Sequence, residues 1–96
     1  MLNNILTHPG GRFRRDGPNS LSDVELLSIV IGSGSKGISA EEIASQLISC
    51  YGSIDRLAGI KLSELMKIKG IGPKKATQIA AIFEITKRII RHLDGD

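Results

Sequence analysis

The same four-residue signal marks two helix starts in this chain. A serine is followed three positions later by a glutamate, first in Ser22–Glu25 and again in Ser39–Glu42. In such a capping box each side chain accepts a hydrogen bond from the other residue's backbone N–H, which fixes the first turn of a helix. Apolar residues recur at helical spacing after both signals, and the two runs end at Gly32 and Gly52. The sequence therefore predicts two helices joined by a glycine–serine turn.

The remainder of the chain also reads as helix and turn. Ser53 can cap a short helix over Ile54 to Ala58, another helix is expected from about Leu62 to Ile68, and a last long one from Pro73 to near His92. Only three of the 96 residues are aromatic, so the core must be built from Ile, Leu, Val and Ala. Strand-like alternation is missing throughout. We expect an all-α, compact bundle of about five short helices over residues 22–93. An N-terminal arm, residues 1–21, precedes it and is expected to be mostly loop, with one helical turn around Arg12–Asp16.

Positive charge gathers in the last third of the chain. Residues 61–96 carry eight basic and four acidic side chains, and four lysines fall within residues 67–75. Such asymmetry suggests a polyanionic partner, although a solvated basic face is the alternative.

The stretch KIKGIGPKKA concentrates this charge around two glycines. Gly70 and Gly72 can adopt positive φ and let another backbone approach, while Ile71 can plug the space between two helices. The N–H groups that begin the last helix would then face an anion, with lysines around them. We expect phosphate contacts that read no sequence. The predicted DNA-binding residues are Lys69, Gly70, Ile71, Gly72, Pro73, Lys74 and Lys75.

This stretch resembles a helix-hairpin-helix motif, whose apolar-x-Gly-Ile/Val-Gly-x-x-x-Ala pattern is met by Ile68, Gly70, Ile71, Gly72 and Ala76. The first turn, GSGSKG, departs from the motif because Ser33 stands where Ile or Val is usual. It is either a weaker phosphate site or a degenerate half kept for packing. The secondary DNA-binding candidates are Gly32, Ser33, Gly34, Ser35 and Lys36 on this turn, with Lys87, Arg88 and Arg91 on the last helix.

A wider resemblance spans roughly residues 12–91. The segments LSDVELLSIVIGSGSKGISAEEIASQLI, YGSIDRLAG and LSELMKIKGIGPKKATQIAAIFEITKR are similar to the N-terminal domain of bacterial RadC-like proteins, a family named for DNA repair. The resemblance implies tandem helix-hairpin-helix motifs with SAM-domain-like packing. It also implies a C-terminal JAB/MPN-type domain with a zinc centre, which this sequence lacks, so we expect the chain to be an N-terminal fragment. In related hairpins, backbone carbonyls hold Na⁺ or K⁺, and the matching positions are Met66, Ile68 and Ile71.

The remaining expectations concern partners and chemistry. The sequence offers no cluster of metal ligands and no catalytic constellation, so we expect a fragment that is not an enzyme and has no metal centre or cofactor beyond that monovalent cation. Cys50 is the only cysteine, which fits a reducing cytoplasm. Neither a membrane-spanning run nor a signal peptide is evident. The expected partners are duplex or branched DNA and the family's C-terminal domain. The alternative is a protein–protein interaction module serving that domain, which would show an exposed apolar patch.

Overall fold

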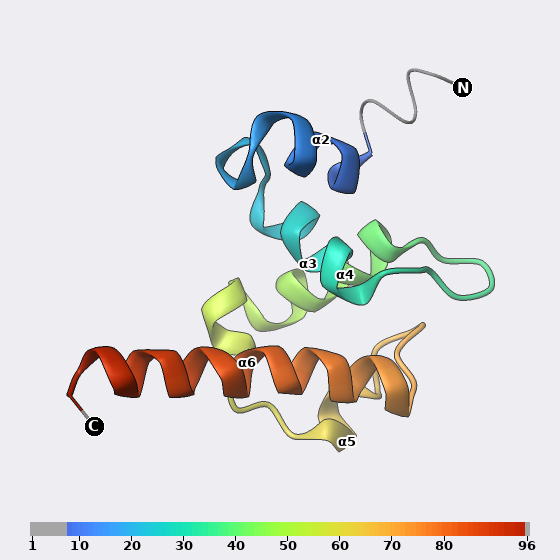
Figure 1. Cartoon of the computed structure of the whole chain (residues 1–96). Coiled ribbons are helices and arrows are strands. Elements are labelled where there is room, and N and C mark those ends of the chain that lie inside the picture. The colour runs from blue at the N-terminus through green and yellow to red at the C-terminus, as the bar shows by residue number, and fades with distance from the viewer. Residues whose placement is uncertain (1–7, 96) are drawn as a thin grey trace.

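The computed structural model describes residues 8–95, and within them the chain forms helices connected by short turns (Figure 1). No β-strand occurs among these residues, so the predicted all-α bundle is confirmed. The elements are α2 (Pro9–Asp16), the 3₁₀ turn η1 (Pro18–Ser20), α3 (Asp23–Ile31), α4 (Ala40–Tyr51), the 3₁₀ turn η2 (Ile54–Leu57), α5 (Leu62–Leu65) and α6 (Pro73–Leu93).

Both capping boxes form as predicted. The hydroxyl oxygen of Ser22 accepts from the backbone N–H of Glu25 at 3.2 Å, and each glutamate side chain accepts from the backbone N–H of its serine. Gly32 and Gly52 close α3 and α4 with φ of 84° and 97°, a conformation that favours glycine. The local signals therefore fix where both helices begin and end.

The short elements between α4 and α6 differ from the prediction. The segment after Gly52 is one 3₁₀ turn, η2, and Ser53 does not cap it with its side chain. The next helix, α5, ends at Leu65 instead of Ile68. Beyond it the backbone N–H groups of Lys67 and Ile68 donate to carbonyls three residues back, which tightens the chain into the following turn.

One apolar core joins the helices. Helix α3 packs against α4 and α6, and α5 packs against α6. The buried apolar residues come from all of these elements and from the turns between them: Leu27, Ile31, Ile38, Ile43, Ala44, Leu47, Leu57, Leu65, Ile71, Ala76 and Ile79. The scarcity of aromatic residues is met by close packing of aliphatic side chains, as expected.

Helix α2 corrects the expectation of an arm that is mostly loop. The imidazole Nδ1 of His8 accepts from the backbone N–H of Gly10 at 3.3 Å, and Pro9 occupies the first turn. Both features favour the start of a helix. An isolated helix of eight residues is marginal in water, so α2 also needs tertiary contacts. Residues 1–7 of the predicted arm lie outside the described residues.

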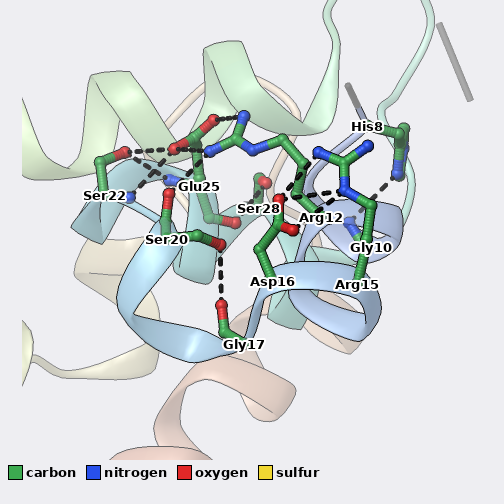
Figure 2. Close-up of polar contacts among 10 residues, drawn as sticks. All are labelled: His8, Gly10, Arg12, Arg15, Asp16, Gly17, Ser20, Ser22, Glu25 and Ser28. Carbon is green, nitrogen blue, oxygen red and sulfur yellow. Dashed lines mark hydrogen bonds and ion pairs between the residues drawn. The ribbon is translucent and has the colours of Figure 1, made fainter. Parts of the chain in front are cut away.

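An ion pair supplies one of those contacts (Figure 2). The Arg12 guanidinium donates to both carboxylate oxygens of Glu25, at 2.5 and 2.8 Å, and to the carbonyl of Ser20 at 3.0 Å. Glu25 thus holds α2 and completes the capping box of α3. Donation first from Arg12 and then from the backbone N–H of Ser22 lowers the Glu25 pKa to about 2. His8 and Pro9 are local signals for the start of α2, but no local pattern could show that α2 packs on α3, because this pair joins residues 13 positions apart.

Candidate nucleic-acid interface

The turn between α5 and α6, residues 66–72, uses its two glycines differently. Gly70 has φ of 91°, and a Cβ placed on it would lie 2.8 Å from Cδ1 of Ile43 and 3.0 Å from Cγ2 of Ile38. Gly72 has φ of −96°, and a Cβ there would meet nothing within 4 Å. The expectation of a positive φ at both positions was therefore wrong for Gly72. Gly70 allows the turn to pack against α4, and Gly72 leaves open surface.

Ile71 lies between the glycines and anchors the turn. Its side chain is only 4 % exposed and joins the core, as predicted. Its backbone N–H donates to the carbonyl of Ile68 at 3.0 Å. The core therefore holds the inner side of the turn in place, while the outer surface of the turn remains accessible.

The outer surface of this turn is the N-terminus of α6. No side chain caps it, and its first turn carries no acidic residue. Pro73 has no N–H, and the first backbone N–H to return to the turn is that of Ala76, which donates to the Gly72 carbonyl at 3.0 Å. The N–H groups of Lys74 and Lys75 therefore have no carbonyl partner within the helix, and they lie at its positive end.

The predicted lysines come directly before and at the start of α6, next to these free donors in the chain. Lys69 and Lys74 are exposed, and Lys75 is half-buried. Uncapped amides, a bare glycine and flanking ammonium groups form a place where one phosphate oxygen can be bound. We call residues 69–75 the hairpin site.

The first turn, between α3 and α4, contacts the hairpin site from the side. The Ser35 hydroxyl donates to the Gly70 carbonyl at 2.9 Å, which joins the two turns at the same end of the molecule (Figure 1). Gly34 permits a close fold-back, because a Cβ there would lie 2.2 Å from the Ile38 carbonyl oxygen. Ser33 and Lys36 are exposed. The Ser35 hydroxyl is thus used in a contact within the protein. This favours the interpretation of the first turn as a degenerate half kept for packing.

Ile38 supplies the apolar plug that Ser33 cannot. It is buried, and its side chain and that of Ile43 are the atoms nearest to Gly70. We did not predict this role from the sequence. A signal was present, since Ile38 directly precedes the N-cap Ser39 and Ile43 follows four positions after it, the spacing of a hydrophobic staple.

The structure does not bring the distal cations of α6 to the hairpin site. Lys87 lies 13 residues beyond Lys74 on one continuous helix, which corresponds to about 20 Å. Arg88 is paired with Glu84 at 3.0 Å, and Arg91 lies 3.9 Å from the same carboxylate. That pairing offsets part of their charge.

Among residues 8–95, no helix is both long and apolar enough to cross a membrane, and no three His, Cys, Asp or Glu side chains gather where they could hold a metal ion. The carbonyl of Ile68, one of three predicted to hold a monovalent cation, accepts from Ile71 N–H. The binding of Na⁺ or K⁺ by Met66, Ile68 and Ile71 stays a prediction.

Comparison with known proteins identifies the family. Residues 6–77 match the sequence model of the UPF0758 N-terminal domain. The chain belongs to the UPF0758 family, which is the RadC-like family. It is 47 % identical over 81 residues to a UPF0758 protein of Pelodictyon phaeoclathratiforme, 46 % to one of Chlorobaculum tepidum and 41 % to one of Methanococcoides burtonii.

Each of these three alignments covers 84 % of this chain but only 35–36 % of the relative. The chain thus spans about a third of the length of the curated relatives it matches. No solved structure matches it significantly.

Proposed function

We propose that this chain binds the phosphate backbone of duplex DNA, without reading its sequence, through the hairpin site acting as a helix-hairpin-helix motif. The observation that carries the proposal is the uncapped N-terminus of α6, where Gly72 leaves open space beside exposed Lys69 and Lys74. Backbone amides bind phosphate oxygen at short range, and lysines attract the polyanion from a distance. A contact of this kind fits a role in DNA repair in the bacterial cytoplasm, and the RadC-like resemblance implies a DNA-repair role. The same contact accepts branched as well as linear duplexes.

The first turn supports the hairpin site in this proposal. Ser35 fixes the Gly70 carbonyl, and Ile38 packs under Gly70, so the α5–α6 turn keeps one shape. A site that is held in its binding geometry loses little conformational entropy when the phosphate arrives. The exposed side chains of Ser33 and Lys36 then add weaker contacts at the rim.

The direct test is a fluorescence-anisotropy titration of labelled duplex at several salt concentrations. Binding should weaken steeply with salt, because each neutralised phosphate releases counterions. Lys74→Ala combined with Lys75→Ala should lower affinity and flatten the plot of log K against log salt by up to about two units.

A matched control removes two cations from the same helix. Lys87→Ala with Arg88→Ala also changes two charges, but about 20 Å from Lys74 along α6. The proposal expects a smaller loss from this pair, in part because Arg88 is already paired with Glu84. Equal losses of affinity from the two double variants would show that the DNA is attracted to the basic residues of α6 in general. That result would reject the hairpin site.

A second candidate function, that of a protein–protein interaction module, is favoured by one observation. Five large apolar residues between the middle of α6 and its C-terminal end are exposed: Ile82, Ile85, Ile89, Ile90 and Leu93. This surface lies away from the hairpin site, so the two functions are compatible.

A further inference from the structure

Helix α6 is longer than the bundle that covers it. Figure 1 shows its C-terminal end extending past the other helices. Its apolar residues nevertheless continue at spacings of three and four, which places them on one side of the helix. The exposed fraction rises along this side, from 43 % at Ile82 to 54 % at Ile85 and Ile89 and 76 % at Leu93. We call these four residues the α6 apolar face.

An apolar pocket adjoins this face. It has a volume of about 370 Å³ and lies between α3, η2 and α6. Leu26, Val30 and Ile54 line it from α3 and η2, and Ile79, Ile82 and Phe83 line it from α6, with the acidic Asp55 among the remaining lining residues. Ile82 belongs to both the pocket and the α6 apolar face, so the two form one continuous surface. Contiguous apolar surface of this kind marks an interaction site.

The charged residues of this part of α6 lie mostly on the other side of the helix from the α6 apolar face, because a helix turns by 100° per residue. Lys87, Arg88, Arg91 and His92 lie on the same turns of α6, and Glu84 is the only acidic residue among residues 82–93. Glu84 is already engaged with Arg88 at 3.0 Å. The α6 apolar face and its pocket therefore suit an apolar segment of a partner.

The relatives contain a segment in the right place. The family model that matches this chain is that of an N-terminal domain, and the relatives are matched over only about a third of their length. In those proteins most of the remaining chain therefore follows the part equivalent to α6, next to the most exposed end of the α6 apolar face. A covalent tether raises the effective concentration of such a partner and favours docking through a modest surface.

We propose that the α6 apolar face and its adjoining pocket are the docking surface for the C-terminal part that the longer UPF0758 proteins carry. The docked segment presents apolar side chains to Ile85, Ile89 and the pocket. This inference does not rest on DNA binding, because the hairpin site lies at the opposite end of α6.

Hydrogen–deuterium exchange can test the proposal on two proteins. The first is this 96-residue chain, and the second is the same chain followed by the part of the Chlorobaculum tepidum relative that lies beyond its matched segment. The amides of residues 82–93 should exchange at least about tenfold more slowly in the longer protein. Ile85→Glu or Ile89→Glu should abolish that slowing. Leu62→Glu, which changes a similarly exposed residue of α5, should leave it intact.

A natural comparison guards against a poorly folded fusion. The full-length Chlorobaculum tepidum protein, compared with itself truncated after the matched segment, should show the same slowing in its equivalent helix. Equal exchange in the long and short forms of either pair would overturn the proposal. So would concentration-dependent dimerisation of the 96-residue chain that Ile85→Glu abolishes, because a second copy would then be the occupant.

Discussion

At the scale of single residues, Gly70 is needed for the fold, whereas Gly72 is needed for the proposed binding of phosphate. The sequence presents them as equivalent members of one motif, but only Gly70 has positive φ and crowded surroundings. Gly72 lies in ordinary extended backbone with open space where a side chain would be. The same substitution at the two positions should therefore give opposite results.

Gly70→Val should destabilise the protein by about 2–4 kcal/mol, because a branched side chain resists positive φ and would overlap Ile43. Gly72→Val should change the free energy of unfolding by less than about 1 kcal/mol. It should still weaken duplex binding roughly tenfold, since its side chain blocks charge-assisted hydrogen bonds to phosphate. Urea unfolding and anisotropy titration of both variants check this pair. A folded Gly72→Val protein with wild-type affinity would show that phosphate does not approach Gly72.

At the scale of elements, α2 depends on one ion pair. Glu25 has its pKa lowered to about 2, first by Arg12 and then by the Ser22 backbone N–H. A carboxylate with a lowered pKa stabilises the folded state above its unfolded pKa, near 4.5, and this contribution is lost as pH falls toward 2. Acid should therefore release α2 from α3.

Amide exchange in α2 is expected to accelerate as pH is lowered from about 4.5 to 2, after correction for intrinsic rates. Glu25→Gln should remove this pH dependence and make α2 exchange faster at neutral pH. Glu84→Gln is a suitable control, because Glu84 also has a lowered pKa but pairs with Arg88 on α6, away from α2. If amide exchange in α2 of the wild-type protein did not change with pH over this window, the role given to the ion pair would be contradicted.

The sequence predicted those elements that local chemistry determines. Capping serines, C-terminal glycines and Pro73 gave α3, α4 and the start of α6, and the pattern around Ile71 gave its burial. Features set by tertiary contacts were missed. Helix α2 needs the distant Glu25, and the conformation of Gly72 follows from how the turn packs rather than from its own residue type.

The exposed end of α6 was missed for a different reason. Helical spacing predicts which residues share a face, and it places Ile90 with Ala76, Ile79 and Phe83 on the apolar face of the last helix. The structure leaves Ile90 53 % exposed, because α6 continues beyond the elements that pack against its first half. Periodicity shows that a face is apolar but does not show whether the same chain covers it.

At the scale of the whole molecule, α6 separates two surfaces of different chemistry. Its N-terminus carries free amides and lysines, and the α6 apolar face runs from its middle to its C-terminal end. With 21 residues the helix is about 31 Å long, so the two surfaces can be occupied at the same time. One domain can thus hold nucleic acid at one end and the rest of a longer protein at the other.

The most direct measurement is an NMR titration of the ¹⁵N-labelled chain with duplex DNA of arbitrary sequence. The account predicts that the amide signals of Gly72, Lys74 and Lys75 shift first and furthest, with smaller shifts in the first turn and none near Leu93. The shifts should be reversed by added salt. Shifts confined to residues 82–93, or none in a folded protein at low salt, would contradict the claim that the hairpin site binds phosphate.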